Sequence, residues 1–141
     1  EVNVNYIDSF SDVLLASEAA KALVGNGADV LTGSAQMVVG ATGVAVEEGV
    51  PWFGSQSNQS GLGEDVVVAS VVYHWEGLLD GVLDNIAAGT LGGEALSISV
   101  ADGGLELEFN DNYELDADVK ASAEATIAGI GDGSIEVPVS E

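Results

Sequence analysis

The chain has 141 residues and a formal net charge of −22, with 24 Asp and Glu against only 2 Lys and Arg. This length suits one domain, and a hydrophobic content of 47% is enough to build a core. The scarcity of cationic side chains excludes nucleic-acid backbones and anionic membrane surfaces as partners. Cysteine is absent, which excludes disulfides and thiolate chemistry. No run approaches the roughly 18 apolar residues of a membrane span, so this segment is not expected to insert into a membrane.

The surplus of acids is typical of a protein that works in concentrated brine. A net charge of −22 produces strong self-repulsion in dilute buffer. At about 1 M salt the Debye length falls to about 3 Å, and neighbouring carboxylates are largely screened. The alternative is a calcium-loaded acidic module, but the chain contains no D-x-[DN]-x-[DN]-G loop and its acids are spread along the sequence. We therefore expect a halophilic protein.

The predicted elements alternate between strand and helix along the first half of the chain. Asp12 and its polar neighbours can cap a helix start, and Gly25, Gly27 and Gly49 can end helices. The elements are a strand at 1–7, a helix at 13–24, a short strand at 28–32, a helix at 37–45 and a strand at 50–53.

The second half of the chain continues this pattern. The apolar run 66–72 predicts a strand covered on both faces. It is followed by an amphipathic helix at 76–86, segments at 96–100 and 105–109 around a turn at 102–104, a helix at about 115–128, and a closing segment at 135–139. This order predicts an α/β fold, a three-layer α/β/α sandwich with a mostly parallel sheet.

Signatures of enzymes are missing from the sequence. It has no G-x-G-x-x-G after the first strand, no P-loop, no G-x-S-x-G and no H-E-x-x-H. Glu106 and Glu108 share a face of a predicted strand, as paired glycosidase carboxylates do, but solvated acids on an exposed face explain them too. His74 could act as a general base, but it could equally cap the start of the helix that follows or line a polar surface. We predict no catalytic residue, no cofactor and no metal site.

The carboxyl ends of the predicted parallel strands are where a ligand is expected to bind. The residues that follow these strands carry hydroxyl, amide and aromatic groups, which suit a flat heterocycle or a sugar. Alternatively, the aromatic rings only cover the end of the sheet. The predicted ligand residues are Phe10, Ser34, Gln36, Gln56, Asn58, Tyr73 and Trp75, with Ser9 and His74 beside them.

Several segments in order along nearly the whole chain carry a resemblance to a known family. They are YIDSFSD at 6–12, GADVL at 27–31, GVPWFGSQSNQ at 49–59, ASVVYHW at 69–75, and GTLGG at 89–93 with DGG at 102–104. Together they resemble the basic membrane lipoprotein (BMP) family, the substrate-binding proteins of ABC importers, several of which bind nucleosides or purines. The resemblance implies that residues 1–141 are a single lobe, the C-terminal one of a two-lobed protein with a type I periplasmic-binding-protein-like fold.

The resemblance also implies roles and partners. The family usually carries Asp at positions 56 and 58, where it hydrogen-bonds a ribose, whereas Gln56 and Asn58 offer uncharged amides. Tyr73 stands where nucleoside-binding members often carry Lys, and a subgroup has aromatic residues at both 73 and 75, as here. The implied partners are a small-molecule solute, the N-terminal lobe of the same chain and an ABC permease. The implied location is the extracellular face of the membrane, with a lipid anchor.

Two other functions stay open beside a solute-binding lobe for a nucleoside or nucleobase. One is a sensor lobe that binds a signal solute and docks to a membrane receptor or regulator. The other is a small flavodoxin-like enzyme domain, which needs a nucleophile or a cofactor fingerprint that the sequence does not show.

Overall fold

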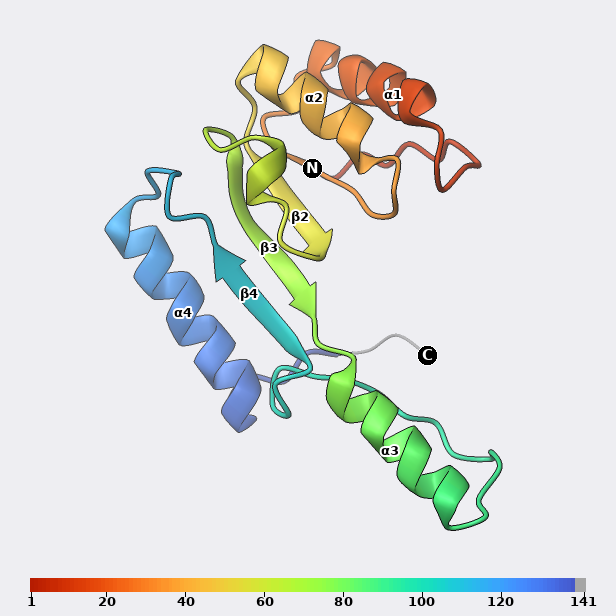
Figure 1. Cartoon of the computed structure of the whole chain (residues 1–141). Helices are drawn as coiled ribbons and strands as arrows, with labels where there is room; N and C mark the ends of the chain where they lie inside the picture. The colour runs from red at the N-terminus through yellow and green to blue at the C-terminus, as the bar shows by residue number, and fades with distance from the viewer. Residues whose placement is uncertain (139–141) are drawn as a thin grey trace. The chain divides into compact units, whose positions relative to one another are not determined.

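The computed structural model describes residues 1–138 and has a mixed α/β fold (Figure 1). Three strands pair in parallel, β1 with β2 and β2 with β3, which confirms the predicted mostly parallel sheet. The four strands form one sheet in the order β1-β2-β3-β4. The elements in chain order are α1 (Val13–Gly25), β1 (Leu31–Thr32), α2 (Val38–Glu48), β2 (Trp52–Gln56), the 3-10 helix η1 (Ser60–Leu62), β3 (Val67–Tyr73), α3 (Glu76–Ala87), β4 (Leu105–Phe109) and α4 (Ala117–Asp132).

The chain forms two compact units. Unit 1 contains Glu1–Val72 and Glu108–Glu114, and unit 2 contains Tyr73–Leu107 and the described residues from Leu115 onward. Within residues 1–138, no helix is both long enough and apolar enough to cross a membrane.

The core of unit 1 lies between its two helices and its parallel strands. Figure 1 shows α1 beside α2, at the start of the chain. Trp52 at the start of β2 is 1% exposed and is the largest buried side chain. Burying such apolar side chains is the main source of folding free energy. The buried core residues are Ala20, Leu31, Val38, Val44, Ala45, Trp52, Val66 and Val67.

The start of α1 and the end of α2 are set by the residues predicted to set them. The Asp12 carboxylate accepts a hydrogen bond from the Leu15 backbone N–H at 3.0 Å and begins α1. Gly49, with a φ of 66°, ends α2 in the left-handed conformation that glycine adopts without strain. The helices predicted at 13–24 and 37–45 are therefore confirmed.

One strand prediction for unit 1 is wrong, and a second strand is shorter than predicted. Residues 1–7 alternate as a strand does, but they pair with no strand among the described residues, and Tyr6 is 88% exposed. A strand forms only where a neighbour completes its hydrogen bonds, and sequence alternation cannot supply that neighbour. The strand predicted at 28–32 is shortened to β1 because the Ala28 N–H donates to the Leu23 carbonyl, which ties residue 28 to the end of α1.

In unit 2, both predicted helices are confirmed. The helix α3 follows its apolar stripe, although none of its residues is buried. The Asp116 carboxylate accepts hydrogen bonds from the N–H groups of Asp118 and Val119 and begins α4. The helix α4 continues four residues past its predicted end, to Asp132.

The remaining predictions for unit 2 concern extended segments. Residues 105–109 form β4, but residues 96–100 form no strand, because Ser99 is engaged in a local turn with Asp102. Residues 135–138 of the closing segment form no strand either, and Val139 lies outside the described residues.

Candidate functional site

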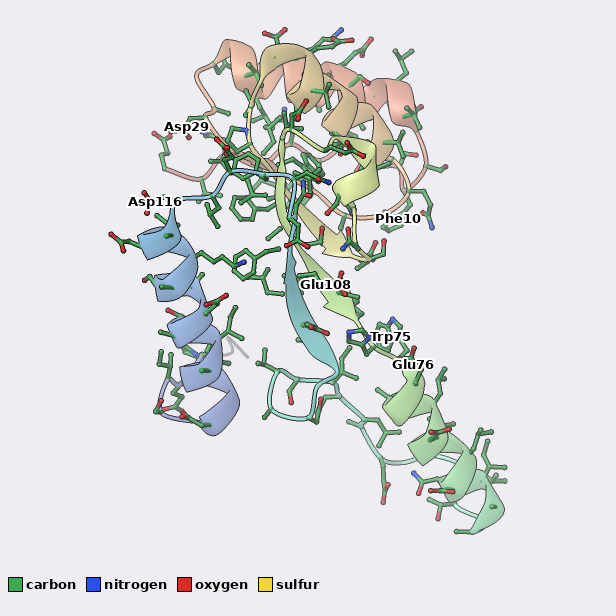
Figure 2. All side chains as sticks on the ribbon, turned by 60° about the vertical axis from the view of Figure 1, so that its left-hand side comes forward. Phe10, Asp29, Trp75, Glu76, Glu108 and Asp116 are labelled. Carbon is green, nitrogen blue, oxygen red and sulfur yellow. The ribbon has the colours of Figure 1, made fainter. Side chains whose placement is uncertain are left out.

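The carboxyl ends of β1 and β2 carry most of the predicted ligand residues of unit 1. Ser34 and Gln36 lie in the loop between β1 and α2, Gln56 is the last residue of β2, and Asn58 follows it. All four side chains are exposed. Phe10, labelled in Figure 2, lies in the segment before α1 and is 80% exposed.

Hydrogen bonds join three segments at one edge of unit 1. We call these segments the unit 1 edge: the Phe10 segment, the loop of Ser34 and Gln36, and Gln56. The Gln56 side-chain carbonyl Oε1 accepts from the Ala35 N–H at 3.1 Å. The Phe10 backbone carbonyl accepts from the Met37 N–H at 3.2 Å. The structure therefore brings together the Phe10 segment, the loop of Ser34 and Gln36, and Gln56. Ser9, in the same segment, accepts hydrogen bonds from the N–H groups of Ser11 and Asp12 through its hydroxyl.

The same edge holds strained backbone. Among the described residues, the non-glycine residues with positive φ are Asp8 at 51°, Ala35 at 70° and Gln56 at 73°. A left-handed conformation costs a residue with a Cβ roughly 1 kcal/mol or more. Such residues persist where the surrounding structure fixes them, and they concentrate at binding sites. Two of the three are the partners of the Gln56–Ala35 hydrogen bond.

Asn58 has both ends of its side-chain amide engaged. Its Nδ2 donates to the carboxylate of Glu108 in β4, and its Oδ1 accepts from the Ser60 N–H at 2.9 Å. The Glu108 carboxylate is thus a hydrogen-bond partner of the Asn58 amide. A ligand that uses Asn58 must replace or extend these bonds.

Tyr73 and Trp75, the predicted ligand residues of unit 2, contact each other. Their ring centroids lie 5.8 Å apart with an interplanar angle of 81°, an edge-to-face arrangement. Trp75 is 49% exposed and stands directly before Glu76, the first residue of α3 (Figure 2). Half of the indole surface is therefore accessible for stacking.

His74, between these two aromatic residues, pairs with an acid. Its Nε2 lies 3.1 Å from Oε2 of Glu106, and both side chains are partly exposed. The N-cap position of α3 is Trp75, without a side-chain hydrogen bond, so the expectation that His74 caps this helix is wrong. An exposed pair of this kind contributes at most about 1 kcal/mol to stability.

A hollow of about 450 Å³ in unit 2 lies between the start of α3 and the loop 96–104. Its lining includes His74, Gly77, Leu96 and Asp102. The Ser99 and Gly104 N–H groups hydrogen-bond the Asp102 carboxylate and hold its pKa below the ordinary value. None of the seven predicted ligand residues lines this hollow.

One polar residue that sequence patterns did not mark lies beneath the unit 1 edge. Gln59 belongs to the polar loop that follows β2, yet its side chain is 6% exposed and bonds to Trp52. Nothing in the local sequence predicts that Gln59 is buried. Both of its neighbours are polar, and apolar residues do not recur at a regular spacing in this loop.

A protein-family model identifies the family of this chain. The Bmp family model, described as an ABC transporter substrate-binding protein, PnrA-like, matches residues 1–139. The chain belongs to the Bmp family. The resemblance found in the sequence is confirmed, and Bmp proteins bind substrates rather than catalyse reactions, so the flavodoxin-like enzyme alternative is wrong. No curated protein sequence matches the chain.

Three solved structures share the Bmp chain's fold at low identity. A transcriptional activator of the comK gene from Bacillus halodurans matches with a TM-score of 0.79 and 22% identity, over 96% of this chain and 48% of its own. Two ABC transporter solute-binding proteins also match. The one from Conexibacter woesei has a TM-score of 0.70 and 22% identity, over 98% and 46% of the two chains. The one from Aeropyrum pernix has a TM-score of 0.74 and 16% identity, over 94% and 46%.

The chain spans about half the length of each of these solved structures. The likeness confirms the predicted fold class of a mixed α/β protein with a mostly parallel sheet.

Proposed function

We propose that the chain is the solute-binding lobe of a substrate-binding lipoprotein of an ABC importer, and that its solute is a nucleoside or a nucleobase. The observation that carries this proposal is the unit 1 edge, where hydrogen bonds join the Phe10 segment, the Ala35 turn and Gln56. Ligands of parallel α/β folds bind at the carboxyl ends of the strands. Membership of the Bmp family supports a solute-binding role.

The chemistry of this edge favours an uncharged ligand with a flat ring. Gln36 and Gln56 offer amides and Ser34 offers a hydroxyl, all of which donate and accept hydrogen bonds. Phe10 exposes most of its ring surface for stacking. Purine bases and riboses carry the matching donors, acceptors and ring faces. Tyr73 and Trp75 remain predicted ligand residues, as the resemblance implies.

The proposal extends to partners and location. Because the related solved structures are about twice as long, we propose that another α/β lobe of the same polypeptide completes the cleft by hinge closure. The loaded protein delivers its solute to an ABC permease at the extracellular face of the membrane, held there by a lipid anchor. The net charge of −22 supports work in concentrated salt.

Calorimetric titration in about 1 M KCl tests the ligand class, with inosine, adenine and ribose as probes. We expect inosine or adenine to bind more tightly than ribose, because only the base offers a ring face. The variant Gln56→Ala is expected to weaken binding about tenfold, the effect of losing about one hydrogen bond.

The matched control is Asn26→Ala. Asn26 is also an exposed amide of unit 1, but it follows α1, on the side where β1 begins. It should leave the affinity unchanged. If Gln56→Ala and Asn26→Ala bind the probes equally well, the unit 1 edge is not the binding site.

A sensor lobe is the second candidate function. It is favoured by the likeness to the Bacillus halodurans protein, which is described as a transcriptional activator. Deleting the gene separates the two. An importer component is expected to be needed for uptake of labelled inosine, whereas a sensor lobe leaves uptake intact and changes the transcriptional response to the nucleoside.

A further inference from the structure

Gln59 is unusual among the residues that follow β2. Gln56, Ser57 and Asn58 are exposed, whereas Gln59 is 6% exposed. The loop therefore turns one amide side chain inward directly after the two amides that the sequence predicts as ligand residues. A buried amide is costly unless its polar atoms are bonded.

The inward amide is bonded to the first residue of β2 and to Ser55, the residue before its last. Its Oε1 accepts from the Trp52 indole Nε1–H at 2.8 Å, and its Nε2 donates to the Ser55 carbonyl at 2.8 Å. The Gln59 backbone N–H donates to the hydroxyl of Ser70 in β3 at 3.0 Å. Trp52 and Ser70 are among the most completely buried side chains of the described chain. Gln59 thus anchors the loop to the rigid core of unit 1.

These bonds bracket the candidate ligand residues. Ser55 immediately precedes Gln56, and Gln59 immediately follows Asn58. The Ser55–Gln59 bond closes a five-residue loop in which Gln56 takes its left-handed conformation, with a φ of 73°. Glutamine does not favour this conformation by itself, so its surroundings hold it: the Ala35 N–H bonds its side chain, and the Gln59 bonds fix the ends of the loop.

The Gln59 side chain packs closely against Gly54 of β2. A Cβ built on Gly54 would lie 2.5 Å from the Ser70 Oγ and 3.0 Å from the Gln59 Cβ and Cδ. The Gln59 side chain therefore lies directly over the backbone of β2, where only glycine allows it. This is close packing of a polar side chain and not a loose loop contact.

We propose that Gln59 is a positioning residue of the solute site. It is buried beneath the loop and does not contact the ligand itself, and it holds Gln56 and Asn58 in the loop conformation that the proposed site uses. The ligand in this inference rests on the proposed function, whereas the effect of Gln59 on the loop does not depend on that function. Preorganising a binding loop raises affinity because less ordering remains for the ligand to impose.

The test compares Gln59→Met with Val44→Ala in the full chain. Methionine keeps the unbranched shape of glutamine and removes both side-chain hydrogen bonds. Val44 is a buried apolar residue of α2, and truncating it weakens the core without touching a polar bond of the loop. Amide hydrogen exchange of residues 55–60, measured against the amides of β3, reports loop order without any ligand. The backbone NMR coupling constant of Gln56 reports its φ.

We expect Gln59→Met to speed exchange in residues 55–60 about tenfold relative to β3, the effect of losing about one buried hydrogen bond, and to change the Gln56 coupling constant. Inosine affinity should fall by a similar factor. Val44→Ala should speed exchange evenly in the loop and in β3. Equal acceleration by Gln59→Met in both regions, with the Gln56 coupling unchanged, overturns the proposal. If the unsubstituted chain binds no inosine, the proposed function fails, and the exchange measurement still decides whether Gln59 holds the loop.

Discussion

The hydroxyl of Ser17 in α1 donates a hydrogen bond to the backbone carbonyl of Gly40 in α2 at 3.0 Å, and it also contacts the Val13 carbonyl. The two helices approach so closely here that a Cβ at residue 40 would overlap the Val13 carbonyl oxygen. The backbone of α2 therefore lies directly against the backbone of α1 at this point. Only glycine permits this contact.

Replacing Gly40 by alanine is expected to lower the free energy of unfolding by about 1–3 kcal/mol, because the helices must separate to admit the methyl group. Urea denaturation followed by circular dichroism measures the change. Gly43→Ala, in the same helix, is the control, since a Cβ there meets nothing within 4 Å. It should be neutral or stabilise by up to about 1 kcal/mol. Equal effects of the two substitutions would contradict the close helix contact.

Removing the side-chain amide donor of Asn110 is expected to lower the free energy of unfolding. Asn110 is 6% exposed, and its Nδ2 donates to the carbonyls of Glu64 and Val67 at 2.8 and 2.7 Å. Asn110→Asp removes both donated bonds and leaves two carbonyls facing a carboxylate, at a cost of about 1–3 kcal/mol or more. The same substitution at exposed Asn112 should cost less than about 0.5 kcal/mol. Urea denaturation of the two variants distinguishes them.

The Asp102 turn of unit 2 is expected to weaken in acid. The Ser99 N–H is the main cause of the lowered pKa of Asp102, followed by the Gly104 N–H and the Ser99 hydroxyl. Because the folded pKa lies below the ordinary value of 3.8, the turn's contribution to stability is present above that value. It is lost as the pH falls through the folded pKa.

Carbon-detected NMR titration of the Asp102 carboxyl checks this expectation. Ser99→Ala removes the hydroxyl and should raise the Asp102 pKa towards its ordinary value. Asp132 is the internal control, since the Ser134 hydroxyl and N–H lower its pKa and Ser99 does not. An Asp102 pKa that is the same in both proteins would show that the hydroxyl has no effect on this carboxylate.

Removing the indole of Trp75 is expected to weaken nucleoside binding about two- to tenfold, the usual worth of one aromatic stacking contact. Trp75→Phe keeps a ring face and should recover most of the affinity. Titration of inosine into the unsubstituted chain, Trp75→Ala and Trp75→Phe gives the comparison. Equal affinity for all three would show that Trp75 is not a ligand residue.

Salt is expected to stabilise the chain. Raising KCl from about 0.1 M to about 1 M should increase the free energy of unfolding by about 1 kcal/mol or more, because screening reduces carboxylate repulsion. A variant with amides at Glu76, Asp80 and Asp84 of α3 should gain less from salt. If the stability of the unsubstituted chain falls with added KCl, the halophilic interpretation is wrong.

Local signals predict the helices well. The helix α3 is predicted at 76–86 and runs over Glu76–Ala87, because its apolar stripe and the glycine beyond it lie within one stretch of sequence. The strand predicted at residues 1–7 is wrong for the opposite reason. Whether an alternating segment pairs depends on a neighbour from elsewhere in the chain, and residues 1–7 pair with no strand among the described residues.

The candidate site is predictable from topology but not in its details. The order of strands and helices is enough to place Ser34, Gln36 and Gln56 at one edge of a parallel sheet. The left-handed conformations of Ala35 and Gln56 follow from contacts between distant segments, since neither residue type favours positive φ. The inward direction of Gln59 depends likewise on Trp52 and Ser70, which lie in other parts of the chain.

The two tryptophans divide between the two units: Trp52 is sealed in the core of unit 1, while Trp75 of unit 2 is half exposed to solvent. Their fluorescence should differ in colour, with a blue-shifted emission from Trp52 and a red-shifted emission from Trp75. Tryptophan fluorescence recorded at the two wavelengths during unfolding then follows the unfolding of each unit separately in a single unlabelled sample. Coincident transitions would mean that the units melt as one cooperative body, and separate transitions would mean that each has its own stability.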